Sequence, residues 1–201
     1  IGQMSCNPAI GGLGKSHLVR EVDALGGIMA QATDQSGIQS RTLNTRKGFA
    51  VQALRVQCDR DKYKKAIQDA LYKTTIDIKE GEVVDILLHN ETIKGVVLKS
   101  GEKIESLKTI LTTGTFLNGV MYKGEETTLG GRVGDDSSVP LSKKLYDLKL
   151  PMGRLKTGTP PRLDANTINW DILEKQKADN DPVFFSFMTR KINLKQIDCH
   201  I

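Results

Sequence analysis

The residue near the start of the chain that is best suited to covalent chemistry is Cys6, because a thiolate is a strong nucleophile. Asn7 and Pro8 follow it, and a helix is predicted to begin shortly afterwards, at Ser16. The positive end of a helix favours a thiolate, but nucleophilic catalysis also needs a base nearby, which a sequence cannot show. The pattern therefore leaves Cys6 as either a nucleophile or a buried structural cysteine.

A glycine-rich stretch follows at residues 9–16, with the sequence Ala-Ile-Gly-Gly-Leu-Gly-Lys-Ser. It nearly fits the nucleoside-triphosphate loop G-x-x-x-x-G-K-[ST], with Ala9 in place of the first glycine. That motif needs a buried strand directly before it, whereas Met4–Pro8 is largely polar and contains a proline. The dinucleotide pattern G-x-G-x-x-G also fails after Gly12 and Gly14. Glycines still let a flat ring or a phosphate approach the backbone, and a plain helix start is the alternative.

Two further segments could contact a cofactor or an anion. Thr112–Thr115 follows a predicted strand, and the carboxyl ends of strands in open α/β sheets face the ligand crevice. Arg154–Arg162 gathers three cations with hydroxyl groups and stiffening prolines, which is typical of an anion or RNA-backbone site. A tight turn and a basic surface loop are the respective alternatives.

Composition indicates a globular chain that can bury a core, with 38% hydrophobic and 26% charged residues among 201. No apolar run approaches the roughly 18 residues needed to span a bilayer, so we expect no membrane contact. Three cysteines without a CxxC pair favour a reducing, cytoplasmic setting, and no histidine has metal-ligand spacing. A net charge of +5 permits nucleic-acid contact but equally suits a solvated surface. Because Ile1 begins the chain within an apparent loop, we expect an internal piece of a longer protein.

Apolar periodicity predicts the elements that must position these segments. We expect helices over 16–25, 59–73 and from 138 onward, with Ser16 and Ser138 as caps and Gly26 as a stop. The first helix would bury one apolar face, made of Leu18, Val19, Val22 and Leu25. Strands 83–88, 93–98 and 103–105 would form a meander, and 108–112 a buried strand. The polar region 33–48 is expected to be loop, and prolines from Pro151 onward predict a domain boundary near 150.

Taken together, several long motifs resemble the MnmG (GidA) family. They are Gln3–Lys15, Glu21–Gly27, Leu111–Leu117, Gly130–Arg132 and Gly153–Arg162, in the order in which the family has them. The resemblance implies an α/β fold, a FAD-binding Rossmann-type domain with a β-meander and an inserted second domain. Residues 1–150 would be the remainder of the FAD-binding domain without its first βαβ fingerprint, and 151–201 the start of the inserted domain.

The resemblance also implies an activity and its partners. Members of the family act on tRNA with the GTPase MnmE and add carboxymethylaminomethyl or aminomethyl groups to C5 of the wobble uridine. They use FAD, NADH and a methylene-tetrahydrofolate carbon, and they are homodimers. We expect this piece alone to be inactive and to bind FAD weakly or not at all.

By matching to the family, individual residues acquire expected roles. Cys6 would be a nucleophile toward the uracil ring, and Lys156 and Arg162 would contact RNA or folate anions. The residues expected to lie along the cofactor are Asn7, Pro8, Gly11, Gly12, Val83, Thr113, Gly114, Thr115 and Ser138. Val83 would approach the adenosine part of FAD through its backbone.

The sequence departs from the family pattern at Ser16, where a glycine is usual, and at Phe49, where a proline is usual. Two alternatives stay open at this point. One is the related folate- and FAD-dependent tRNA uracil-5-methyltransferase TrmFO, and the other is a nucleotide-binding module built on residues 9–16.

Overall fold

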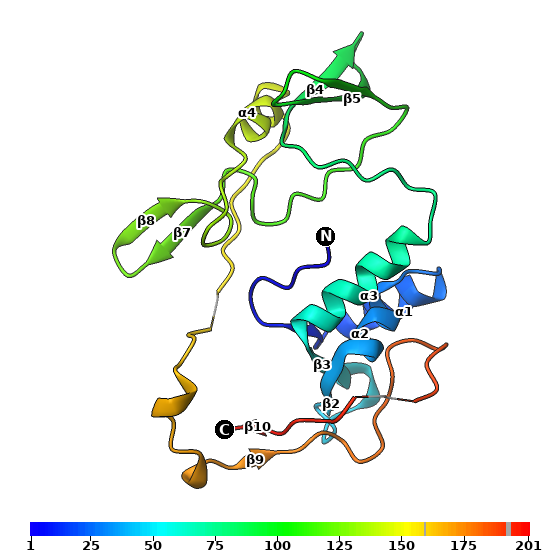
Figure 1. Cartoon of the computed structure of the whole chain (residues 1–201), viewed down its shortest axis with the longest axis vertical. Coiled ribbons are helices and arrows are strands. Elements are labelled where there is room, and N and C mark those ends of the chain that lie inside the picture. The colour runs from blue at the N-terminus through cyan, green and yellow to red at the C-terminus, as the bar shows by residue number, and fades with distance from the viewer. Residues whose placement is uncertain (159, 192–193) are drawn as a thin grey trace. The chain divides into compact units, whose positions relative to one another are not determined.

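The computed structural model of the protein describes residues 1–158, 160–191 and 194–201. It divides into two compact units (Figure 1). Unit 1 comprises Ile1–Ile76 together with Gly158–Ile201, and unit 2 comprises Asp77–Thr157. The assignment of residues 1–150 and 151–201 to two domains of a longer protein stays a prediction.

Unit 1 is built on a three-stranded antiparallel sheet in the order β1-β3-β2. Its strands are β1 (Ala9–Gly11), β2 (Gly37–Leu43) and β3 (Ala53–Cys58), with a 3-10 turn η1 (Phe49–Val51) before β3. Helices α1 (Lys15–Ala24), α2 (Met29–Ser36) and α3 (Arg60–Tyr72) pack with the sheet. The later part adds η2 (Ala165–Thr167), η3 (Trp170–Ile172) and the antiparallel pair β9 (Lys175–Gln176) and β10 (Cys199–His200).

The later part of unit 1 is attached to strand β2 by hydrogen bonds. The carboxylate of Asp179 accepts the N–H of Thr42 at 2.6 Å, and the N–H of Asp179 donates to the carbonyl of Ser40 at 3.0 Å. Farther along the chain, the N–H of Ile197 donates to the carbonyl of Ile38 at 2.7 Å. These bonds satisfy the outer edge of β2, which would otherwise be an exposed strand edge.

Helix α3 confirms the predicted helix over 59–73. Asp59 caps it, because the side chain accepts hydrogen bonds from the N–H groups of Asp61 and Lys62. Tyr63 and Ile67 are buried in the core of unit 1. The cap at Asp59 and the buried apolar residues together define the helix.

Helix α1 differs from its prediction at the cap and along its face. The helix begins at Lys15, after Gly14 at φ 73°, and Ser16 is buried inside it instead of capping it. Of the predicted apolar face only Val19 is buried, whereas Leu18, Val22 and Leu25 are 61%, 46% and 90% exposed. The described sheet of unit 1 has three strands, and within α1 only Ser16 and Val19 are buried. The left-handed stop at Gly26, with φ 85°, is confirmed.

The prediction of a loop over residues 33–48 is wrong, because α2 and β2 occupy most of this range. Several of its polar side chains are buried, and two of their hydroxyl groups bond to the backbone of α2. The hydroxyl of Thr33 donates to the carbonyl of Met29 at 2.7 Å, and that of Ser36 donates to the carbonyl of Ala32 at 2.7 Å. Composition alone suggested a solvated segment, but these local bonds let hydroxyl residues lie in a core.

Unit 2 contains the predicted meander, which is confirmed as β4 (Val83–His89), β5 (Thr92–Leu98) and β6 (Lys103–Glu105). Asn90 and Glu91, at φ 47° and 60°, form the tight turn between β4 and β5. Helix α4 (Val139–Asp147) also confirms its prediction, although the Ser138 side chain makes no cap hydrogen bond. A hairpin of β7 (Val120–Lys123) and β8 (Glu126–Leu129), which the sequence did not predict, completes the unit.

The predicted buried strand over 108–112 is wrong in this structure. These residues form no strand, and Ile110 and Leu111 are 86% and 42% exposed. A buried strand needs partner strands at its edges, and none of the described strands pairs with this segment. The mixed α/β class is confirmed, and all pairs of named strands in the described residues are antiparallel.

Among the residues that the structure describes, no helix has the length and apolar character needed to cross a bilayer.

Candidate functional site

A pocket of about 520 Å³ in unit 2 brings together residues from three separate segments. Val83, Thr113 and Ser138, each expected to contact a cofactor, all line it. The remaining lining residues are Gly81, Glu82, Thr112, Phe116, Arg132, Asp135, Asp136, Ser137 and Leu141. Residues that are far apart in the sequence therefore share one concave surface of the size usual for small-molecule sites.

The bend at 113–116 is attached to the start of α4 through the backbone of Phe116. Its N–H donates to the carbonyl of Thr113 at 3.1 Å, and its carbonyl accepts the N–H of Ser138 at 2.8 Å. The hydroxyl of Ser137 donates to the same carbonyl at 3.3 Å. Gly114 and Thr115 lie in this bend but do not line the pocket, and the Thr115 hydroxyl instead donates to the carbonyl of Gly131 at 3.0 Å. Thr113 and Phe116 of this bend therefore line the pocket, whereas Gly114 and Thr115 support them from outside the lining.

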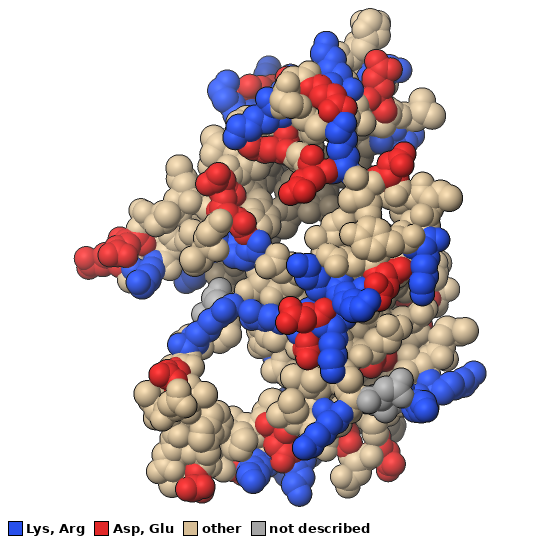
Figure 2. Space-filling view, viewed as in Figure 1, with Lys and Arg blue, Asp and Glu red and all other residues tan. Residues whose placement is uncertain are grey.

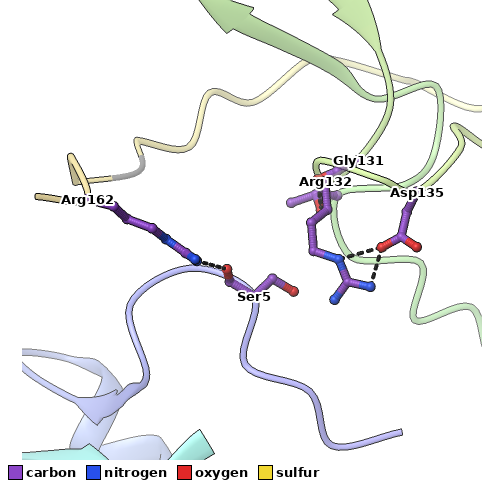
Figure 3. Close-up of polar contacts among 6 residues, drawn as sticks. Ser5, Gly131, Arg132, Asp135 and Arg162 are labelled. Carbon is purple, nitrogen blue, oxygen red and sulfur yellow. Dashed lines mark hydrogen bonds and ion pairs between the residues drawn. The ribbon is translucent and has the colours of Figure 1, made fainter. Parts of the chain in front are cut away.

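The glycine at position 131 is required by close packing. A Cβ there would lie 2.6 Å from Cδ1 of Phe116, which is closer than real contacts allow. The next residue, Arg132, forms an ion pair with Asp135 (Figure 3). Its guanidinium lies 5.8 Å from the ring centre of Phe116. These contacts fix one side of the pocket.

The charges that line the pocket indicate what it could bind. Glu82, Asp135 and Asp136 are acidic, and Arg132 is the one basic residue in the lining. Carboxylates accept hydrogen bonds from sugar hydroxyl groups, as the acidic residue of dinucleotide sites does for ribose. The lining therefore suits a nucleoside better than it suits a diphosphate. The sequence reasoning missed Glu82, Asp135 and Asp136, because no motif contains them.

An ion pair between Asp85 and Lys144, at 3.0 Å, holds α4 against β4 beside this pocket. Burial raises the pKa of the Asp85 carboxyl, but hydrogen bonds from Lys144 and from the N–H of Ile86, with the charge of Lys144, outweigh it and lower the pKa. Because the two side chains are partly exposed, the ion pair adds little to the stability of the fold. Its main role is to orient α4 relative to β4.

A second group of predicted residues lies in unit 1, around the loop that carries Cys6. The thiol of Cys6 donates to the carbonyl of Gly158 across 3.9 Å, and Arg60 donates to the carbonyl of Cys6. Arg162 donates to the carbonyl of Ser5 at 3.2 Å (Figure 3). The structure therefore brings Arg162 next to the loop of Cys6, with two guanidinium groups bonded to its backbone.

The glycine-rich loop combines one packed glycine with two open ones. A Cβ on Gly11 would lie 2.1 Å from the carbonyl oxygen of Leu54 and 2.7 Å from Cζ of Phe185. Gly12 and Gly14 have φ 97° and 73°, and a Cβ on either would meet open space. Gly11 is thus explained by packing, whereas Gly12 leaves room for a ligand to approach the backbone.

The structure does not support the interpretation of residues 9–16 as a nucleoside-triphosphate loop. Strand β1 is only three residues long and lies at the edge of an antiparallel sheet, whereas a phosphate loop follows a central strand. Asn7 and Pro8 use their carbonyls within the fold, accepting the N–H groups of Ala9 and Cys58 at 2.8 and 2.6 Å.

The remaining predicted contact residue, Lys156, is exposed and belongs to unit 2. Nearby, Arg154 donates to the carbonyl of Asn118 at 3.0 Å. Thr159 of the same basic motif lies outside the described residues.

Within the described part of the chain, no three His, Cys, Asp or Glu side chains are placed to hold a metal ion.

Comparison with known proteins places the chain in a family. The sequence profile of the family described as Glucose inhibited division protein A matches residues 1–201. The tRNA uridine 5-carboxymethylaminomethyl modification enzyme MnmG of Granulibacter bethesdensis is 49% identical over 205 residues, which is 100% of this chain and 33% of that protein.

Solved structures agree with the sequence match. GidA of Aquifex aeolicus in crystal form I is 44% identical, with a TM-score of 0.92, over 100% of this chain and 35% of that chain. Crystal form II gives a TM-score of 0.91 at 44% identity, over 100% of this chain and 34% of that chain. The chain thus spans about a third of the length of its relatives. A match along all 201 residues, in sequence and in fold, shows that the chain belongs to the GidA family.

Proposed function

We propose that this chain is part of a FAD-dependent enzyme that adds a carboxymethylaminomethyl or aminomethyl group to C5 of the wobble uridine of tRNA. The observation that carries the proposal is the match over the whole chain to a relative named as a tRNA uridine 5-carboxymethylaminomethyl modification enzyme. Because the chain spans 33% of that relative, the activity belongs to the complete protein. The complete protein would act in the cytoplasm as a homodimer with the GTPase MnmE.

The pocket of unit 2 is compatible with the adenosine part of FAD. Its volume of about 520 Å³ and its carboxylates suit a nucleoside with free hydroxyl groups. Val83 and Thr113 would lie along the adenosine. Ser138, at the start of α4, would offer its hydroxyl, because its backbone N–H and carbonyl already bond to Phe116 and Asn118. Gly114 and Thr115 would support this wall without touching the ligand.

The loop at Gly12 is compatible with a flat ring, because nothing in the described residues fills the space where a Cβ would be. Asn7, Pro8 and Gly11 would hold this wall in place through the packing and hydrogen bonds described above. When FAD is bound, it supplies the redox chemistry, with NADH as the reductant.

Cys6 would act on the uracil ring. Its thiolate would form a bond to C6 of the uridine, which moves an electron pair toward C5. C5 would then form a bond to the methylene carbon of methylene-tetrahydrofolate as one of its two carbon–nitrogen bonds breaks, and loss of the C5 proton would expel the thiolate. Ammonium or glycine would replace the folate nitrogen that is still bound to this carbon, which gives the aminomethyl or carboxymethylaminomethyl group and releases tetrahydrofolate. Arg60 and Arg162, bonded to the carbonyls of Cys6 and Ser5, would keep the loop in one conformation during these steps. Arg162 and Lys156 would attract the anionic groups of RNA or folate.

The complete protein provides the test of this proposal. Purified with its flavin, it should show the absorption of bound FAD and should modify tRNA in the presence of MnmE, NADH and methylene-tetrahydrofolate. Nucleoside mass spectrometry should find the new group on the wobble uridine. A methyl group at another uridine would instead support the methyltransferase alternative. Tight binding of Mg-ATP without any flavin would contradict the proposal.

The role of Cys6 is tested by Cys6→Ser in the complete protein. The variant should retain FAD and lose tRNA modification, because a hydroxyl is a much weaker nucleophile than a thiolate. Cys199→Ser is the matched control, since Cys199 is also partly exposed and bonds to the side chain of Gln39. Undiminished modification by Cys6→Ser would make Cys6 structural.

A further inference from the structure

Four consecutive residues, Phe184–Phe187, are held in place by side chains of α1 and α2. Arg20 donates to the carbonyl of Phe184 at 2.9 Å, and its guanidinium lies 5.6 Å from the ring centre of Phe187. The two oxygens of Asp34 accept the N–H groups of Phe185 and Ser186, each at 2.9 Å, and Asp23 accepts that of Phe187 at 3.0 Å. We call this arrangement the backbone clamp. It fixes a segment that has no regular secondary structure of its own.

The backbone clamp places the next four residues beside α2. There, Met188, Thr189, Arg190 and Lys191 line a pocket of about 330 Å³ together with Gln31 and Gln35 of α2. The polar groups in this lining are two amides, a hydroxyl, a guanidinium and an ammonium group. It contains no carboxylate, whereas the pocket of unit 2 contains three. These are the donors that recognise a phosphate oxygen.

The two cations of this pocket are not neutralised within the described residues. Arg190 and Lys191 are exposed, and neither forms an ion pair or a side-chain hydrogen bond with another described residue. Figure 2 shows basic side chains projecting from the edge of unit 1 where the orange segment of this region runs in Figure 1. Unpaired cations attract an anionic partner, and no ion pair within the described residues has to break when it binds.

An aromatic side chain adjoins the pocket and favours a nucleic acid over a free anion. Phe187 is 64% exposed and immediately precedes the lining residue Met188. Proteins that bind single-stranded RNA combine cations for the backbone with exposed aromatic rings on which bases stack. Arg190 and Lys191 supply such cations here, and Phe187 supplies an exposed ring beside them.

We propose that the pocket formed by Gln31, Gln35 and Met188–Lys191 binds a backbone phosphate of tRNA, with Phe187 available to stack an unpaired base. The inference rests on the proposed function, since it assumes that the complete protein acts on tRNA. It adds a contact surface that no motif of the sequence indicated.

The test measures tRNA binding by the complete protein with FAD bound, across a series of salt concentrations. Arg190→Ala with Lys191→Ala should weaken binding by roughly tenfold or more at low salt and reduce the slope of log K against log salt by about 1 to 2. FAD content should stay unchanged, because neither residue lines the pocket of unit 2. Phe187→Ala should weaken binding while leaving the salt slope as it is in the wild type.

Lys94→Ala with Lys103→Ala is the matched control, because it removes the same charge from exposed positions on β5 and β6. If the Arg190/Lys191 variant binds tRNA with the affinity and salt slope of the wild type, the pocket is not a tRNA-binding site. The proposed function would be unaffected by that result. An equal loss in the control would also overturn it, since the effect would then reflect net charge alone. A wild-type protein that binds no tRNA would overturn the proposed function and, with it, this inference.

Discussion

The carboxylate of Asp34 accepts the backbone N–H of Phe185 at 2.9 Å, across 151 positions of sequence. Asp34 is 5% exposed and Phe185 is fully buried. Through this bond, the Phe185 ring is held against the backbone of Gly11, in the loop that we propose to face the cofactor. This buried carboxylate therefore connects α2 to the last part of unit 1, and the Phe185 ring that it helps to position packs on the first strand.

Removal of this carboxylate should loosen the backbone clamp. Asp34→Ala leaves two buried N–H groups without an acceptor, which we expect to cost about 2–4 kcal/mol. Hydrogen exchange of the amides of Phe185 and Ser186 in the complete protein should become roughly 30-fold faster or more, since 1.4 kcal/mol corresponds to about tenfold. Asp69→Ala is the control, because the exposed Lys65–Asp69 pair should contribute under about 1 kcal/mol. Unchanged protection in Asp34→Ala would contradict the clamp.

Two adjacent glycines should respond differently to alanine. Gly11→Ala places a Cβ against the Leu54 carbonyl and the Phe185 ring, so the complete protein should lose about 3 kcal/mol of stability or more. Gly12→Ala meets open space and should cost only about 1–2 kcal/mol for its positive φ. If the loop faces the cofactor, Gly12→Ala should instead reduce the FAD retained on purification, measured by absorbance. Equal stability of the two variants would contradict the packing role of Gly11.

The wall of the pocket in unit 2 should depend on Gly131. Gly131→Ala would push Phe116 away, and we expect the affinity for FAD in the complete protein to fall roughly tenfold, equivalent to about 1.4 kcal/mol. Gly124→Ala, in the turn between β7 and β8, is the control, because its Cβ would meet open space. Flavin fluorescence during titration would measure both affinities. If Gly131→Ala binds FAD as tightly as Gly124→Ala, the pocket is not the cofactor site.

Stability should fall at alkaline pH because of Cys58. Burial raises the pKa of the Cys58 thiol to about 11 from the ordinary value of 9.0, and the negative charges of Asp34 and Asp59 add to the increase. The folded state therefore holds the proton more tightly than the unfolded state, so this stabilisation is complete below pH 9 and is lost as the pH rises to about 11. Its full size is about 3 kcal/mol, since each pKa unit corresponds to about 1.4 kcal/mol.

Thermal unfolding of the complete protein between pH 8 and pH 11 would test this effect. The wild type should lose more of its thermal stability over that range than Cys58→Ala, which has no thiol to ionise. Parallel pH profiles for the two proteins would show that Cys58 is not responsible.

The sequence by itself determined the elements whose signals are local. Helix α3 has its cap at Asp59 and its apolar stripe within the same fifteen residues, and the β4-β5-β6 meander has its turns beside its strands. The motifs likewise led to the correct family, because each motif is a continuous run of residues. Both kinds of signal can be read without knowledge of any distant contact.

Only the tertiary structure decided which distant residues meet. The sequence of α2 and β2 is typical of a loop, but in the structure Asp34 binds the backbone of Phe185, and the hydroxyl groups of Thr33 and Ser36 bond within α2. Val83, Thr113 and Ser138 share a pocket because Phe116 connects two segments through its backbone, and Arg162 reaches the loop of Cys6 from the other end of unit 1. The physical reason is that a buried polar group must find a partner somewhere in the fold, and the sequence near that group does not say where the partner lies.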